Sequence, residues 1–582
     1  GKWVKIRVED EGVYSITSGM LTGMGFNNPD KVSLYGYNLP FLPETHIENI
    51  NDDLTEIPLY RREDGTLLFY SCGTTRWTRS SLSSSEFTHV NNPYSRYIYY
   101  FVTEQAETAP LRIKAREIDD DALTSTSTFY DHALVEADEF SFINAGRTFY
   151  EKYDFANGRK KTYTVDLPGI CSNEATLTVK FAAAGSTASH LTVSANDTTY
   201  RTVSYKALSE YIYAVDLTSK FKFSQAKPQT TVTLTTDGLS GVSGHLDYIQ
   251  INYTRRLDLS GIQQLSFRPS DSASSHKFQI SNAGAGTSVW NVTPGDSVYE
   301  FKGKLDGTTY TVCTSSSGKL TEYIAVNTNA NFPKPEVIGT VDNQDLHSLH
   351  DIDLVIIVPA NGRLMSQAQR LADAHTAADS IRCAVVRADQ VYNEFSSGTP
   401  DITAYRRLMK MLYDKAGENI ASRPKNICLF GDGVWDNRMV TSGMILRKQD
   451  DYLLCYESDN SISHTDSYVC EEYVTLLGDG KGTSPLKEKL DCGVGRIPVT
   501  TETEAKAVVD KLTAYIGNEQ IGDWKNTVCV MADDGNANIH MKDAESIVTQ
   551  IGKLYPDLAV KKIFLSRLKR LGVKSQRGDR GL

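Results

Sequence analysis

The sequence predicts a multidomain chain: a β-rich N-terminal region with a β-sandwich, followed by an α/β domain with a mainly parallel sheet. Two observations carry this prediction. Residues 131–260 contain short strand-like segments at regular spacing, separated by Gly, Asn and Ser turns, which is typical of a β-sandwich or jelly roll. From residue 351 onward, strand-like and helix-like segments alternate. Such alternation indicates a parallel sheet wrapped by helices.

The first 345 residues divide into three predicted β-rich parts. Residues 1–130 form a β-rich N-terminal domain, because WVKIRV alternates and RYIYYFVT is rich in aromatic, strand-forming residues. The sandwich follows over 131–260, and a small β-rich module is expected over 261–345. Exposed aromatic side chains on the sandwich could bind carbohydrate. The alternative is that the sandwich is a spacer that supports a neighbouring domain.

The α/β domain is predicted over 346–565. Its apolar runs predict strands at 353–358, 383–386, 426–430, 527–532 and 560–565. Helices are expected at 364–378, after Asp401 as N-cap with Gly417 as the stop, and at 544–554. Thr501 and Glu504 form a capping-box pattern for a further helix through Tyr515. In such a sheet, ligands bind at the carboxyl ends of the strands.

Composition argues against several classes of protein. The chain carries 61 Lys and Arg against 72 Asp and Glu, a net charge of −11, so it lacks the basic face that nucleic-acid binding requires. No run of 18 apolar residues is present, so no membrane-spanning helix is predicted. The chain opens on GKWVKIRV without Met, which is consistent with a removed leader. Nine scattered Cys without CxxC spacing argue against a zinc site and against a dense disulfide framework.

Two acidic loops follow predicted strands of the sheet. FGDGVWDN places Asp432 and Asp436 after the strand at 426–430, and ADDGNANIH places Asp533 and Asp534 after the strand at 527–532. Carboxylate and Asn oxygens on a Gly-containing loop can bind a hard cation, so a structural calcium ion is one interpretation. Neither loop has the EF-hand spacing. Turn formation and helix capping are the alternative.

The sequence offers no internal catalytic motif. GxSxG, HExxH, P-loop and dinucleotide-binding patterns are absent. His464 and Cys470 are close in sequence, but nothing places a thiolate at a helix N-terminus beside a base. An acidic stretch, 455–473, lies in the irregular segment between the strand at 426–430 and the helix that follows Thr501. We call this segment the excursion, and a substrate-facing loop is expected there.

From residue 353 onward the chain resembles the gingipain family of cysteine peptidases, whose fold is caspase-like. The resemblance is carried by DLVIIV, FGDGVWDN, SHTDSYV, LDCGVGRIPV, the helix at 502–515 and WKNTVCVMADDGNANIHMKDAE. The opening GKWVKIRVEDEGVYSIT and the sandwich ending LDYIQINYTRRL more specifically resemble the surface sortases of the type IX secretion system. The resemblance therefore implies a partial caspase/gingipain-like α/β domain behind the β-rich region.

The resemblance also implies a function. It implies a thiol peptidase or transpeptidase at the outer surface of a Gram-negative cell, exported through a removed signal peptide. The enzyme would remove the C-terminal signal domains of secreted cargo and join the cargo to lipopolysaccharide, beside other type IX secretion components. No cofactor is required for such catalysis, in which a thiolate attacks and His moves protons. Asp466, in the stretch SHTDSYV, is implied as a substrate-binding residue; a loop-capping Asp is the alternative.

The tail, 566–582, departs from the family. The family's catalytic His and Cys follow the segment that matches 560–565, and the tail contains neither; it has six Lys or Arg and one Asp. We expect a truncation or frame change, a disordered tail, and a chain that is inactive as given. The alternatives are a nucleic-acid arm for the tail, an internal thiol such as Cys470 as nucleophile, and a non-catalytic adhesin or carbohydrate-binding protein.

Overall fold

The computed structural model describes residues 1–45, 52–105, 107–118, 123–295, 297–316, 320–518 and 520–565. The predicted tail, 566–582, lies outside the described residues. The chain divides into two compact units, Gly1–Lys506 and Ala507–Leu582, and each is described by itself. Within the described ranges, no helix is long and apolar enough to cross a membrane.

The N-terminal region is built on a five-stranded sheet in the order β27-β1-β9-β3-β4. The alternating WVKIRV segment forms β1 with every second side chain buried. The bounds of the sheet are β1 Trp3–Val8, β3 Val32–Tyr35, β4 Glu56–Ile57, β9 Ile98–Glu104 and β27 Glu336–Val341. β27 lies in the segment predicted as a separate module, yet it pairs with β1, with Val341 opposite Trp3.

Smaller elements complete this region. They are α1 Ser18–Met24, a three-stranded sheet of β2 Glu11–Ile16, β6 Leu67–Cys72 and β5 Tyr60–Arg61, and a hairpin of β7 Thr75–Arg79 and β8 Phe87–Asn91. Thr17 caps α1 by accepting a hydrogen bond from Met20 N, and Gly25 ends it in a left-handed conformation.

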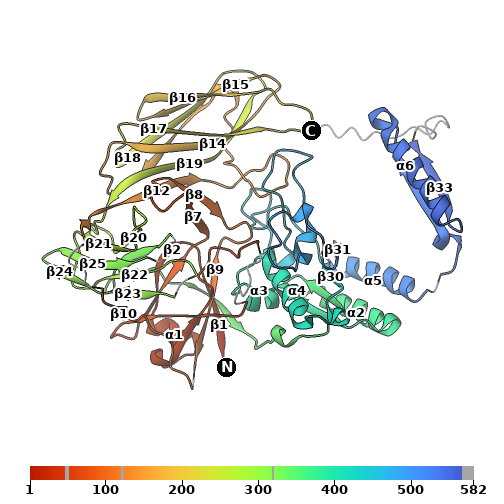
Figure 1. Ribbon diagram of the computed structural model, residues 1–582, viewed down its shortest axis with the longest axis horizontal. Helices are drawn as coiled ribbons and strands as arrows, with labels where there is room; N and C mark the ends of the chain where they lie inside the picture. Colours follow the sequence, from red (N-terminus) through yellow and green to blue (C-terminus); the bar gives the residue numbers. More distant parts are fainter. Residues whose placement is uncertain are drawn as a thin grey trace. The chain divides into compact units, whose positions relative to one another are not determined.

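The predicted β-sandwich is present as two four-stranded sheets, whose strands lie in the upper part of Figure 1. One sheet has the order β12-β19-β14-β17 and the other β13-β18-β15-β16. Their facing side chains, such as Leu177, Val193, Leu234 and Ile251, are buried in one apolar core. The bounds are β12 Thr128–Glu136, β13 Lys160–Asp166, β14 Ala175–Ala184, β15 Ser189–Ala195, β16 Thr198–Tyr205, β17 Val215–Phe223, β18 Gln229–Thr236 and β19 Ser243–Arg256.

The following β-rich segment forms two further sheets, β10-β23-β22-β26-β20 and β11-β21-β25-β24. It shares a core with the N-terminal region, because Val13 and Leu68 pack in one cluster with Trp290 and Val326. The bounds are β10 Ala115–Arg116, β11 Ser125–Thr126, β20 Gln264–Phe267, β21 Ser275–Ile280, β22 Thr287–Asn291, β23 Tyr299–Phe301, β24 Gly303–Asp306, β25 Thr309–Ser315 and β26 Tyr323–Asn327.

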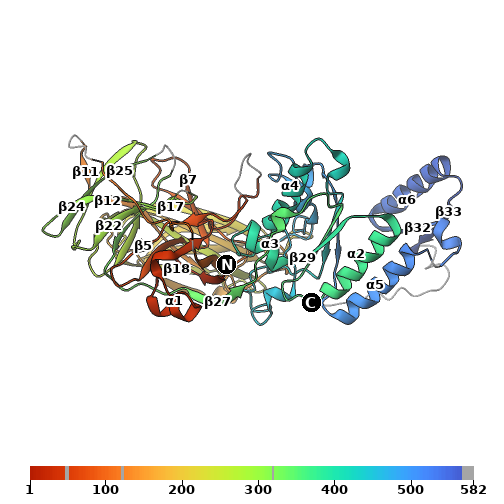
Figure 2. The same cartoon turned by 90° about the horizontal axis from the view of Figure 1, so that it is seen from below.

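The α/β part of the first unit has a four-stranded sheet in the order β29-β28-β30-β31, with every neighbour parallel. Its strands are β28 Leu354–Val358, β29 Cys383–Arg387, β30 Asn426–Phe430 and β31 Gly493–Ile497, and its helices are α2 Met365–Asp379, α3 Ala388–Phe395 and α4 Ile402–Ala416. α5, Glu502–Ile516, begins in this unit. Figures 1 and 2 both show α3 next to the β-rich region and α2 farther from it. The predicted parallel sheet is confirmed.

The predicted helix caps are also confirmed. The Asp401 side chain accepts a hydrogen bond from Thr403 N at the start of α4. At the start of α5, the Glu504 carboxylate accepts from Thr501 N at 3.1 Å, and Thr501 Oγ1 accepts from Glu504 N at 3.2 Å. These two bonds form the reciprocal capping box. In the α/β part of the first unit, β31 and α3 were not predicted.

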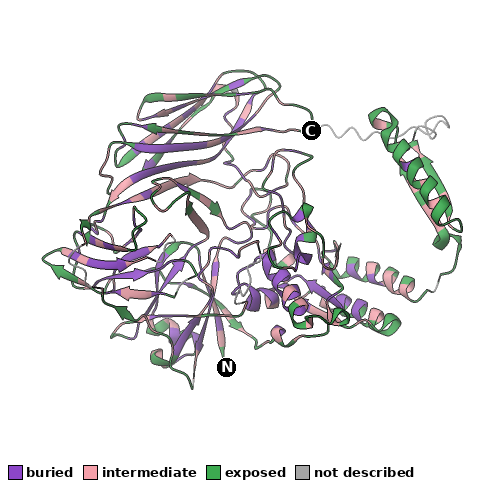
Figure 3. Ribbon diagram, viewed as in Figure 1, coloured by how far each residue is buried: buried purple, intermediate pink, exposed green. Residues whose placement is uncertain are grey.

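The second unit contains β32 Thr527–Ala532 and β33 Ala559–Phe564, which pair in parallel and are connected through α6 Gly535–Leu554. Asn536, Ala537 and Asn538 all have left-handed backbone angles, so regular helix begins only after them. Figure 3 shows α6 with little buried surface. Met531 on β32 is 72% exposed and Leu554 on α6 is 66% exposed.

Candidate functional site

The loops at the carboxyl edge of the parallel sheet are tied to one another by backbone hydrogen bonds. After β30, Gly431 N donates to Ile497 O at 3.0 Å and Asp432 N donates to Val499 O at 3.1 Å. Leu453 N in turn donates to Asp432 O at 2.9 Å. The FGDGVWDN loop is therefore held between the end of β31 and the predicted irregular excursion, at the edge where α/β folds place their ligands.

Asp436 is buried and organises the turn after this loop. Its carboxylate accepts from the backbone N–H groups of Arg438, Val440 and Thr441 at 3.1, 2.8 and 2.7 Å, and from Thr441 Oγ1 at 2.7 Å. Four donors on one carboxylate correspond to the turn-forming interpretation. The Asp432 carboxylate accepts from the adjacent Gly433 N, at 2.9 Å. Calcium binding by these two residues stays a prediction.

We expect Asp436→Ala to lower the free energy of unfolding by about 2–4 kcal/mol, because several buried backbone donors lose a charged acceptor. Asp432→Ala, the matched control from the same loop, should change it by less than about 1 kcal/mol. Urea denaturation with and without calcium chloride measures both effects. A calcium-dependent rise in stability that both substitutions abolish would instead establish the predicted calcium site.

Arg496 on β31 clamps the excursion to the sheet. Its guanidinium makes a bidentate pair with Glu471, at 2.6 Å from Nε and 3.0 Å from Nη2. It also donates to Gly431 O at 3.1 Å and to Leu454 O at 2.9 Å. One side chain thus joins the loop after β30 to both ends of the segment 454–471. Sequence reasoning missed Arg496 because it lies in the Gly-rich run DCGVGRIPV, where no strand was expected.

Asp466 lies at an exposed tip of the excursion. Its Oδ2 accepts from Ser463 Oγ at 2.9 Å. The tip is attached to the sandwich, since Tyr213 N donates to Ile462 O at 2.8 Å and His464 N donates to Tyr211 O at 2.9 Å. The carboxylate is therefore placed by the sandwich as well as by its own loop, and it retains room to contact a ligand.

The sandwich segment also contributes Arg147, a largely buried residue near Glu457, and sequence reasoning missed both residues. The guanidinium of Arg147 lies 2.8 Å from Glu44 Oε1 and 4.3 Å from the centre of the Tyr456 ring. The neighbouring Glu457 is 2% exposed, and burial raises the pKa of its carboxyl to about 9, an effect that Arg147 partly offsets. No sequence signal identifies this pair, because its members are 310 positions apart by their residue numbers.

Asp533 and Asp534 belong to the second unit. Asp533 Oδ1 lies 2.6 Å from His540 Nδ1, and this contact is the main cause that holds the pKa of Asp533 below its usual value. Across the described ranges, no group of three or more His, Cys, Asp or Glu side chains is arranged to hold a metal ion. A calcium ion at either predicted loop would need backbone oxygen or water ligands.

The thiols of the sheet and excursion are poorly suited to nucleophilic attack. Burial raises the pKa of Cys470 to about 11 and those of Cys428, Cys455 and Cys492 to about 12. The thiolate is the reactive form, so these groups are protonated and weak nucleophiles at neutral pH.

Comparison with protein families finds one similarity in the α/β part of this chain. Residues 347–579, which include this sheet edge and most of the predicted tail, match the model of peptidase family C25. The α/β part is therefore gingipain-like, and the family that it resembles is one of cysteine peptidases.

One solved structure is similar over nearly the whole chain. It is the crystal structure of dimeric latent PorU from Porphyromonas gingivalis, which is 27% identical, with a TM-score of 0.79. The match covers 90% of this chain and 50% of that one, so this chain spans half the length of the PorU chain that it matches. The chain is thus PorU-like in its β-rich region as well as in its peptidase domain.

Other similarities are confined to small parts of the chain. A CBM36 domain of a xylanase from the hindgut metagenome of Trinervitermes trinervoides is 16% identical, with a TM-score of 0.16. This match covers 21% of this chain and 96% of the CBM36 domain. A family 35 carbohydrate-binding module from an environmental isolate is 13% identical and covers 22% of this chain and 92% of its own, with a TM-score of 0.17. Neither supports a functional argument. No curated protein sequence matches the chain.

Proposed function

We propose that this chain belongs to a type IX secretion sortase, a cysteine peptidase that removes C-terminal signal domains from secreted cargo. The whole protein would act at the outer surface of the cell, beside other type IX components, and transfer the cargo to lipopolysaccharide. The observation that carries this proposal is the similarity to PorU over 90% of the chain. A shared peptidase domain alone would support only a peptidase; the shared β-rich region supports the sortase assignment.

We expect the 582-residue chain to be inert toward peptide bonds. Cysteine peptidases need a thiolate beside a base, and the thiols of Cys72, Cys171 and Cys383 donate hydrogen bonds to backbone carbonyls. The measurement is cleavage of a fusion protein that ends in a type IX signal domain, followed by mass spectrometry. Thiol-dependent cleavage by this chain would contradict the expectation and would point to an internal thiol such as Cys470.

The nucleotide sequence beyond codon 565 tests the sortase proposal directly. We expect one reading frame there to encode an apolar strand, a His-Gly turn and then a strand that ends in Cys. If no frame does so, the protein is a non-catalytic relative, and the sortase assignment is withdrawn.

In the protein made from such a complete frame, Asp466→Asn should lower kcat/KM for the signal-domain fusion by about tenfold, through loss of one charged contact to substrate. Asp459→Asn is the matched control: its side chain lies in the same excursion and is 95% exposed. Equal rates for both variants would assign Asp466 to loop capping alone.

A further inference from the structure

The hairpin of β7 and β8 has one covered edge and one uncovered edge. The strands pair with Thr75 opposite Asn91 and Arg79 opposite Phe87. On the β8 side, Phe87 N donates to Asn252 Oδ1 at 3.2 Å and Phe87 O accepts from Gln250 Nε2 at 2.6 Å. Side chains of the sandwich strand β19 therefore satisfy the outer backbone groups at that end of β8.

The outer edge of β7 has no such cover. Asn92 N donates to Thr74 O at 2.8 Å, so this pair is hydrogen-bonded across the hairpin. In an antiparallel pair, hydrogen-bonded and non-bonded positions alternate, so the N–H and C=O groups of Thr75, Trp77 and Arg79 point away from β8. Within the described part of the chain, these outward groups form no backbone hydrogen bond.

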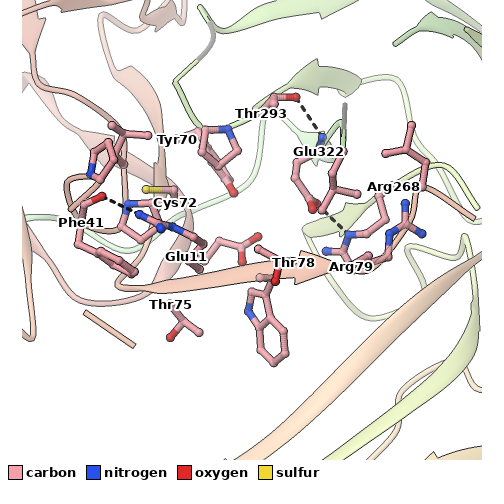
Figure 4. Close-up of a pocket in the computed structure, with 18 of the residues that line it drawn as sticks. Glu11, Phe41, Tyr70, Cys72, Thr75, Thr78, Arg79, Arg268, Thr293 and Glu322 are labelled. Atoms are coloured by element: carbon pink, nitrogen blue, oxygen red, sulfur yellow. Dashed lines mark hydrogen bonds and ion pairs between the residues drawn. The ribbon is translucent and has the colours of Figure 1, made fainter. Parts of the chain in front are cut away.

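A cleft of about 570 Å³ runs along this edge, and every residue of β7 lines it. Figure 4 shows Thr75, Thr78 and Arg79 on one side of the cleft, with Thr293 and Glu322 on the other. Successive side chains of a strand point to opposite faces of the sheet. All five residues of β7 can therefore line one cleft only because the cleft runs along the edge of the strand.

The chemistry of the cleft favours a ligand that carries a carboxylate. The Arg79 Nε is buried and has no hydrogen-bond partner in the described structure. Arg76 donates through Nη2 to Phe41 O at 3.1 Å, and its guanidinium lies 3.8 Å from the centre of the Phe41 ring. Burial lowers the pKa values of both arginines, which a negative partner would restore.

The acidic and apolar parts of the lining are consistent with the same ligand. Glu322 is paired with Arg268 at 2.8 Å, and Glu11 accepts from Ser266 Oγ at 2.5 Å, so both carboxylates already have donors. Leu39, Phe41 and Leu82 add apolar surface to the cleft.

We propose that this cleft binds an extended acidic peptide, which adds to β7 as a third strand of the hairpin. The peptide backbone would pair with Thr75, Trp77 and Arg79, a carboxylate side chain would contact Arg76, and an apolar side chain would pack on Phe41. Main-chain pairing would give affinity, and the alternating side chains would give specificity. This site lies outside the peptidase domain and does not depend on peptidase activity.

The test uses the full chain and a fluorescein-labelled peptide, Ser-Val-Thr-Val-Glu-Val-Thr-Ser, acetylated and amidated, with fluorescence anisotropy as the readout. Two N-methylated versions block either one edge or the other edge of the peptide. We expect one version to bind about tenfold more weakly than the other, because it cannot pair with β7. Arg76→Gln should weaken binding about fivefold for the Glu peptide and less than about twofold for its Gln counterpart. Arg201→Gln, on an exposed position of β16, is the matched control.

Other occupants of the cleft would give different results in these binding experiments. Equal binding of both N-methylated peptides would show that strand pairing is not used and would overturn the proposal. No binding of the unmodified peptide would overturn it as well. A concentration-dependent dimer that the peptide does not dissociate would assign the edge to a second copy of the chain. If Arg76→Gln loses the preference for the Glu peptide over the Gln peptide, while Arg201→Gln keeps it and both variants have native circular dichroism, the proposed carboxylate contact is supported.

Discussion

Replacement of Arg268 by leucine is expected to lower the free energy of unfolding of the first unit by about 3–5 kcal/mol. Arg268 is 3% exposed and joins two parts of the β-rich region. Its Nε donates to Glu322 Oε2 at 2.8 Å, and its Nη1 donates to Asp131 Oδ1 at 3.3 Å. Asp131 lies on the sandwich strand β12, whereas Glu322 directly precedes β26.

The cost comes from the partners that the substitution leaves behind. Burial raises the pKa of Glu322, and Arg268 partly offsets that effect. Without the guanidinium, Glu322 must either remain charged without its main partner or take up a proton. Asp131 keeps a second partner, Arg255 Nη1 at 2.9 Å. Most of the lost stability is therefore expected to come from Glu322.

Urea denaturation measures this loss, with two further variants. Arg256→Leu, on the exposed end of β19, should change stability by less than about 0.5 kcal/mol. The double variant Arg268→Leu/Glu322→Leu should recover at least half of the loss, because it removes the orphaned charge together with its partner. A single-variant loss below about 1 kcal/mol would show that water reaches Glu322 and satisfies it.

The parts of the fold that sequence predicted are those determined by local physical chemistry. Alternation along WVKIRV and the apolar run LVIIV identify strands because burial alone fixes their pattern. The caps at Asp401 and Thr501 were predictable because each satisfies orphan N–H groups within its own helix.

The missed elements depend on contacts that are distant in sequence. β31 contains two glycines and an arginine, so it becomes a strand only through pairing with β30. The pairing of β27 with β1 could not be predicted, because the two strands are more than 300 residues apart in the sequence. α3 has eight residues, too few for a clear helical period, and Arg387 N donates to Gln390 Oε1 at its start.

The candidate site likewise has features that the sequence could predict and features that depend on contacts distant in sequence. The position of Asp436 followed from strand order, and four donors from its own turn occupy its carboxylate, which corresponds to the turn-forming interpretation drawn from the sequence. Glu457 and Arg147 could not be paired from sequence, since only the docking of the sandwich against the excursion places them together. Polar residues that act across domains carry no local pattern.

Glu457→Gln is expected to raise the free energy of unfolding at pH 7 by about 3 kcal/mol. Burial raises the pKa of Glu457 to about 9 from a usual value of 4.5, so the folded protein holds a proton that the unfolded chain releases near pH 4.5. Stability from this proton is complete below pH 4.5 and is lost as pH rises toward 9. Gln keeps an acceptor oxygen for the N–H of Gly146 but has no proton to lose.

Urea denaturation at intervals from pH 5 to 8.5 separates this effect from a simple gain in packing. The stability of the wild type should fall by up to about 1.4 kcal/mol per pH unit more steeply than that of Glu457→Gln. Glu418→Gln, at an exposed position, should keep the wild-type slope. Parallel slopes for Glu457→Gln and wild type would show that Glu457 is ionised in the folded protein. Because Glu457 lies in the excursion that carries Asp466, hydrogen exchange there should also accelerate as pH approaches 9, beyond its intrinsic rise.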